Sequence, residues 1–224
     1  MNLPNRHIQN LLDCLTRSRL SFALYRLPWT DECYFVLQQS GDVEQLADIR
    51  ELNKKKGFVM APFLQSDHHP LIVIRPDITA YDWDEISEAI SSLECADALL
   101  TCKNQTEKLS PFVSEETDKE RYTQAFERFI TPLQKKHFQK LVLSRSSTKH
   151  INDDFSPLAA FVRACNNYPR MMIYLCHTPV SGTWVGSTPE ILLSGKHGKE
   201  WHTVAWQAPC RCKTKSCQWT GTRR

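Results

Sequence analysis

The chain has 224 residues, with 28 Lys and Arg against 25 Asp and Glu, so its formal net charge is +3. This length allows one domain, or two small ones, with a sizeable apolar core. No apolar run is long enough to span a bilayer, and no basic stripe interleaved with aromatic residues indicates nucleic-acid binding. The first six cysteines are scattered singly and the first residues lack the apolar core of a secretory signal, so we expect a cytoplasmic protein with reduced thiols.

The first half of the chain predicts one helix followed by strands. Apolar residues recur at helical spacing within residues 4–20. Apolar runs rich in β-branched and aromatic residues predict four strands, of which the first two form a hairpin, at 21–28, 32–39, 58–63 and 69–77. The mixed, polar residues 78–117 are expected to include a loop.

The second half predicts two clear helices and further hairpins. Thr117 and Glu120 have the spacing of a capping box, and aromatic and apolar residues follow on one helical face. Ser156 and Pro157 are a typical N-cap and first residue for a helix over 158–167. Strands are predicted at 140–145, 170–176 and 183–187, and within 189–195. A helix followed by antiparallel hairpins indicates an α+β fold and not a doubly wound parallel sheet.

Two short segments carry the chemical signal of the sequence. One is "KLVLSR" at 140–145, and the other is "GSTPEILL" at 186–193. Alone, Lys140 is typical of a solvated charge at a strand start, and Glu190 of a turn residue. Together and in this order, the segments resemble two motifs of the chorismate-utilising enzymes, "[KQ]-x-V-x-[SA]-R" and "G-x-[ST]-P-E-x-L". That family includes anthranilate, aminodeoxychorismate, isochorismate and salicylate synthases.

The resemblance implies a fold of two packed, mainly antiparallel sheets flanked by helices. The chain would hold the N-terminal part of that fold and would be incomplete. Residues 1–113 are then the variable N-terminal part of the domain. Residues 114–204 are the first part of the chorismate-binding catalytic region, and 205–224 are a tail outside the family pattern.

The lysine at position 140 indicates which of the family's activities the resemblance implies. Family members that add ammonia to chorismate have Gln at this position, whereas isochorismate and salicylate synthases, which add water, have Lys. The resemblance implies an isochorismate synthase of menaquinone or siderophore synthesis, with Lys140 as general base and Glu190 as general acid. It also implies Mg²⁺ as cofactor, with the family's metal ligands in the part of the fold that this chain lacks, and a monomer in the intact form. A salicylate synthase is the alternative enzyme.

Other histidine and cysteine groups are weaker candidates. The adjacent residues Asp67, His68 and His69 could suggest a metal-binding site, but such a run is more typical of a surface loop. A zinc site in the tail would use Cys210, Cys212 and Cys217, with His202 as a candidate fourth ligand, but this spacing is not a common zinc pattern. A non-catalytic fragment with a metal- or partner-binding tail is the alternative outside enzymes.

The tail differs in composition from the rest of the chain. From Ala205 onward there are five Lys or Arg and no Asp or Glu, and without them the chain has 23 basic and 25 acidic residues. The family continues here with a signature close to "LAGT". Regrouping the possible codons after the loss of one base before Trp206 permits "LAGT" at this place, followed by an acidic stretch. We therefore expect a frameshift product, truncated relative to the family and inactive as this chain.

Overall fold

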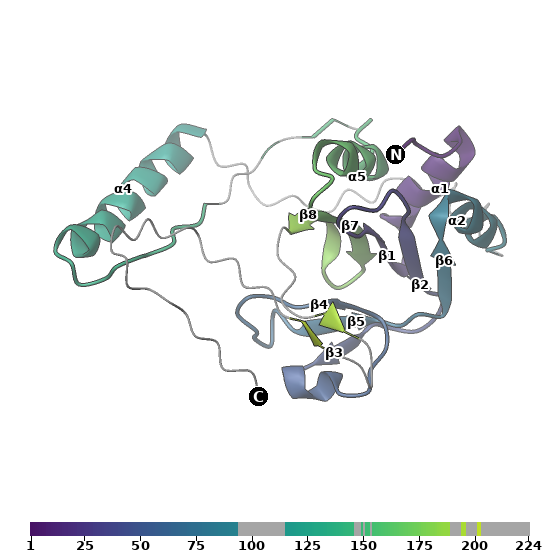
Figure 1. Cartoon of the computed structure of the whole chain (residues 1–224), viewed down its shortest axis with the longest axis horizontal. Helices are drawn as coiled ribbons and strands as arrows, with labels where there is room; N and C mark the ends of the chain where they lie inside the picture. The colour runs from purple at the N-terminus through teal and green to yellow at the C-terminus, as the bar shows by residue number, and fades with distance from the viewer. Residues whose placement is uncertain are drawn as a thin grey trace.

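A computed structural model of the chain describes residues 1–93, 115–145, 149, 151–152, 154–188, 194–195 and 201–202. Two antiparallel sheets pack face to face, and helices cover the outer face of the larger sheet (Figure 1). This arrangement confirms the predicted α+β fold of two packed antiparallel sheets with flanking helices.

The larger sheet has five antiparallel strands. Their order across the sheet is β6 (Ile78–Tyr81), β2 (Tyr34–Gln38), β1 (Ser21–Arg26), β7 (Met172–Thr178) and β8 (Gly182–Thr188). The predicted hairpins β1–β2 and β7–β8 are confirmed. Pairing of β1 with β7 joins the hairpins, so strands from the expected ranges 1–113 and 114–204 share one sheet.

Three helices pack on one face of this sheet: α1 (Arg6–Leu15), α2 (Asp82–Ser91) and α5 (Pro157–Asn167). The Asn5 side chain caps α1 by accepting from the Ile8 N–H, and Ser156 caps α5 as predicted. Alternation along β1 explains the layering. Phe22 and Leu24 face the helices, and Ala23 faces the second sheet.

The second sheet is smaller and lies on the other face. Its strands are β3 (Glu44–Leu46), β5 (Leu71–Ile74) and β4 (Phe58–Met60), with a short 3₁₀ helix, η1 (Ile49–Leu52), beside β3. Ile72 and Ile74 pack against Ala23 and Cys176 of the larger sheet. A separate two-stranded ribbon pairs β9 (Ser194–Gly195) with β10 (Trp201–His202).

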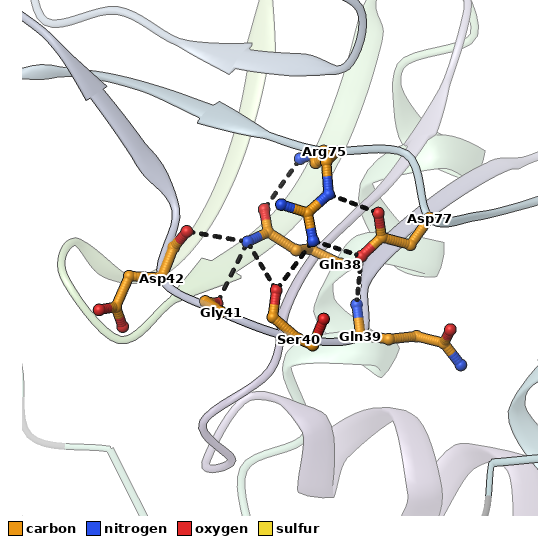
Figure 2. A network of polar contacts seen from close by, with 7 residues as sticks. All are labelled: Gln38, Gln39, Ser40, Gly41, Asp42, Arg75 and Asp77. Atoms are coloured by element: carbon orange, nitrogen blue, oxygen red, sulfur yellow. Dashed lines mark hydrogen bonds and ion pairs between the residues drawn. The ribbon is translucent and has the colours of Figure 1, made fainter.

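A polar network links the two sheets at the end of β2 (Figure 2). The Gln38 side chain is 2% exposed, accepts from the backbone N–H of Arg75 and donates to three carbonyls of the following turn, those of Ser40, Gly41 and Asp42. The guanidinium of Arg75 bonds Asp77 and the Ser40 carbonyl. These hydrogen bonds therefore hold the turn through which the chain passes from β2 of the larger sheet to β3 of the smaller sheet.

Helix α4 (Glu115–Gln134) lies apart from the two sheets (Figure 1). The predicted helix is confirmed, but it begins at Glu115, so the prediction of Thr117 as its N-cap is wrong. The aromatic side chains of the helix are open to solvent, since Tyr122 and Phe126 are both more than one-third exposed.

The prediction of a strand at 140–145 is wrong. Residues 140–145 have no regular structure, because no described strand pairs with them, and Val142 is 76% exposed. An isolated strand has no partners for its backbone hydrogen bonds. Residues 78–117 begin with strand β6 and helix α2, whose Ile86 and Ile90 pack in the core, and the loop expected within this range stays a prediction because residues 94–114 lie outside the described residues.

Candidate active site

The first motif segment follows α4 and is open to solvent. Lys140 is exposed, as are Ser144 and Arg145. The guanidinium carbon of Arg145 lies 5.9 Å from the centre of the Tyr122 ring, a cation–π contact that joins the segment to α4. Lys140 is thus open to solvent in this arrangement, and its role as general base stays a prediction.

The second motif segment begins at the end of β8. Gly186, Ser187 and Thr188 pair with β7, and the next residues, including Glu190, lie outside the described residues. Because Glu190 is outside the described residues, its pairing with Lys140 as acid and base stays a prediction.

Gly186 has a steric reason to be glycine. It lies directly opposite Tyr174 in the β7–β8 register, and a Cβ atom at this position would overlap the far end of the Tyr174 ring. The absence of a side chain lets the ring lie against the β8 backbone. The glycine of the motif thus fixes the packing of the strand that leads into Glu190.

Four tyrosines form a row across the larger sheet that ends at this glycine. Tyr81, Tyr34, Tyr25 and Tyr174 are direct cross-strand neighbours on β6, β2, β1 and β7. The ring centres of Tyr34 and Tyr81 are 5.0 Å apart, and those of Tyr25 and Tyr34 are 5.2 Å apart. Phe58 of β4 lies over the row, 5.5 Å from the Tyr25 ring. The result is an aromatic strip between the sheets.

Burial sets the proton state of this strip. The pKa of Tyr25 is raised by burial and by the neighbouring phenol of Tyr34, and burial likewise raises the pKa of Tyr174. Both phenols therefore keep their protons at neutral pH, which excludes them as general bases and leaves them as hydrogen-bond donors. The strip can pack apolar or ring surface, but it does not supply a base.

The tyrosine row was not predicted from the sequence, although two of its four residues lie on the predicted β1–β2 hairpin. Tyr25 and Tyr34 lie on the two strands of the predicted β1–β2 hairpin, so their proximity could have been inferred, but a turn at 29–31 would pair Tyr25 with Phe35, and the observed register pairs it with Tyr34. The contributions of Tyr81 and Tyr174 depend on the long-range pairs β2–β6 and β1–β7. Those pairs are not encoded in any local pattern.

Metal ligands are not assembled in the part of the chain that the structure describes. No group of three or more His, Cys, Asp or Glu residues there is placed to hold an ion, so the described residues do not fit a Mg²⁺ site. His68 and His69 lie in an exposed turn, which confirms the predicted surface loop. His202 is in β10, and Cys210, Cys212 and Cys217 lie outside the described residues.

Comparison with known proteins gives one result. A family model with the description "Chorismate binding enzyme" matches residues 48–206, which is more than half of the chain. No curated protein and no solved structure matches. Within the described residues, no helix is both long enough and apolar enough to cross a membrane.

Proposed function

The chain belongs to the family of chorismate binding enzymes, and we propose that its reaction is the conversion of chorismate to isochorismate, for menaquinone or siderophore synthesis. The family match carries the chorismate part of the proposal. Lys140 at the first position of the "KLVLSR" segment supports water, and not ammonia, as the nucleophile, because the resembling ammonia-using enzymes have Gln there.

The proposed reaction uses one base and one acid. The neutral Nζ of Lys140 takes a proton from water as the water oxygen bonds to ring C2. The two ring double bonds shift, the C4–oxygen bond breaks, and the Glu190 carboxyl gives its proton to the departing hydroxyl, which leaves as water. A lysine serves as base only when its pKa is lowered, and a glutamic acid as proton donor near neutral pH only when its pKa is raised.

The position of the two motif segments suggests what the 224-residue chain will do in an assay. Glu190 follows β8 by two residues, so a well-ordered hairpin packed through Gly186 and Tyr174 leads to it. Lys140 is exposed on a segment without regular structure. Because Lys140 is open to solvent and no described strand pairs with its segment, we expect this chain to turn over chorismate too slowly to detect.

We further propose that residues 206–224 are read in a shifted frame. The family match ends at residue 206, at the point where acidic residues stop and cysteines and basic residues begin. A regrouped reading of the same bases permits the family signature "LAGT" at this point. Resequencing the gene across codon 205 tests this, and an intact frame with no "LAGT" in any reading refutes it.

The activity is tested with the frame-restored protein and chorismate, with products separated by chromatography. We expect isochorismate, loss of turnover on removal of Mg²⁺ with a chelator, and loss of turnover in both Lys140→Ala and Glu190→Gln. Lys135→Ala and Glu120→Gln change exposed residues of the same kinds and serve as controls. Salicylate with pyruvate as the product would favour the alternative enzyme. Full activity of Lys140→Ala or Glu190→Gln would remove the role assigned to that residue.

A further inference from the structure

The outer edge of β8 is open in the part of the chain that the structure describes. β8 is the last strand of the sheet order and pairs only with β7 among the described strands. Trp184 on one face of the strand is 53% exposed, and Val185 on the other face is 40% exposed. Among the described strands, the outer edge of β8 therefore has no pairing partner, and an exposed apolar side chain lies on each face of it.

This edge lacks the features that usually prevent edge-to-edge pairing. β8 is seven residues long, and its sequence, GTWVGST, contains no charge and no proline. The opposite edge, β6, is only four residues long and lies between Asp77 and Asp82. Short edge strands and flanking charges disfavour added strands, so the sheet is protected at β6 and not at β8.

We propose that β8 is the docking surface for a second copy of the chain, which adds its own β8 antiparallel across a two-fold axis at Val185. In this register Val185 lies opposite Val185 of the second copy. Trp184 lies opposite Gly186, and Thr183 opposite Ser187. The strand is self-complementary, because each large side chain meets a small one or its own apolar equivalent. No like charges are brought together.

The glycine makes this register specific. The Tyr174 ring already lies against Gly186 on the face that Trp184 also occupies. Antiparallel pairing places Trp184 of the second copy on that same face, beside the end of the Tyr174 ring. The tyrosine row would then continue through the interface. A shift of the register by one residue would bring Val185 opposite Trp184 or Gly186 and lose this arrangement.

Two features of β8 favour a second copy of the chain over a different protein as its partner. The side chains of two antiparallel β8 strands complement each other in size, and neither strand carries a charge. A strand of the same chain is the competing occupant, with residues 140–145 as the candidate. That occupant would cover the edge inside one molecule and leave a monomer. The inference concerns this chain and does not depend on the proposed activity, and the monomer expected for the intact form stays a prediction.

The first test measures the mass of the full chain by sedimentation over a range of concentrations. We expect a monomer–dimer equilibrium. Val185→Lys and Val185→Glu should each raise the dissociation constant about tenfold, because like charges then meet at the axis. An equal mixture of the two variants should restore the dimer, which also shows that both are folded. Val180→Lys, in the turn before β8, is the matched control and should leave the equilibrium unchanged.

The second test determines which residues of the two β8 strands lie opposite each other. Residues at the axis of an antiparallel pair have Cα atoms about 4.5–5.5 Å apart, within reach of a disulfide. Val185→Cys should cross-link to a dimer on mild oxidation, well above the wild-type background, and Val180→Cys should not. A monomer at all concentrations, no rescue by the Lys and Glu mixture, or equal cross-linking of the two cysteine variants would each overturn the proposal.

Discussion

The buried amide of Gln38 offers the sharpest test of how the two sheets are held together. Gln38→Met keeps the length of the side chain and removes four hydrogen bonds, whose donor–acceptor distances are 3.0 to 3.3 Å. Gly41 and Asp42 are exposed, so their carbonyls can bond water instead. Ser40 is exposed as well and its carbonyl also accepts from the Arg75 guanidinium, so the main loss falls on the backbone N–H of Arg75.

At about 1 kcal/mol per bond, with an added cost for a buried group left without a partner, we expect the variant to lose ~3 kcal/mol of unfolding free energy. For a chain of this length that corresponds to a fall in Tm of about 6–12 °C. Urea unfolding followed by circular dichroism measures it. Gln39→Met is the control, because the Gln39 side chain points away from the network (Figure 2) and only its backbone N–H bonds Asp77.

The pH dependence of the stability of a charged variant, Gln38→Glu, tests the same role of the Gln38 side chain. Gln38→Glu places a carboxylate against three carbonyl oxygens, so its pKa in the folded protein should lie above the unfolded value. A group with a raised folded pKa stabilises below its unfolded pKa, about 4.3, and loses that contribution as pH rises. Gln38→Glu should therefore be less stable at pH 7 than at pH 4, relative to wild type. Equal stability of Gln38→Met and Gln39→Met would refute the bracing role of the amide.

Three further predictions concern the sheet and its buried polar groups. Gly186→Ala should destabilise the protein by ~1–3 kcal/mol by overlap with the Tyr174 ring, and the cost should largely vanish in a Tyr174→Ala background, which a double-mutant cycle in urea measures. Burial raises the pKa of Cys33 and Cys176 from 9.0 to about 12. Their stabilising contribution is therefore complete below pH 9 and lost as pH rises toward 12, so the double alanine variant should show a shallower fall in urea midpoint above pH 9. Arg26 is 2% exposed and donates to five backbone carbonyls, so Arg26→Met should cost ~3–5 kcal/mol, and retention of the wild-type Tm would contradict its role.

Arg26 shows why buried polar residues escape sequence reasoning. It ends β1, where the sequence reads as a strand interrupted by a charge. In the fold its guanidinium reaches the carbonyls of Tyr168, Pro169 and Met171, more than 140 positions away in the chain. A loop that links α5 to β7 supplies the acceptors that make its burial tolerable. No pattern near Arg26 announces those partners.

The sequence alone determined the elements whose causes are local. The spacing of apolar residues predicted α1, and Ser156 with Pro157 predicted the start of α5. The β1–β2 and β7–β8 hairpins followed from short turns between apolar runs. The two motif segments indicated the chorismate-utilising family, and the family match over residues 48–206 confirms it.

Only the tertiary structure decided which strands meet and which segments remain without partners. The β1–β7 pair builds the tyrosine row and leaves β8 at the edge, while residues 140–145, predicted as a strand, pair with no described strand and have no regular structure. Helix caps and turns involve residues a few positions apart, so the sequence records them directly. Strand pairing closes long loops and depends on faces contributed by distant segments, so its outcome exists only in the folded chain.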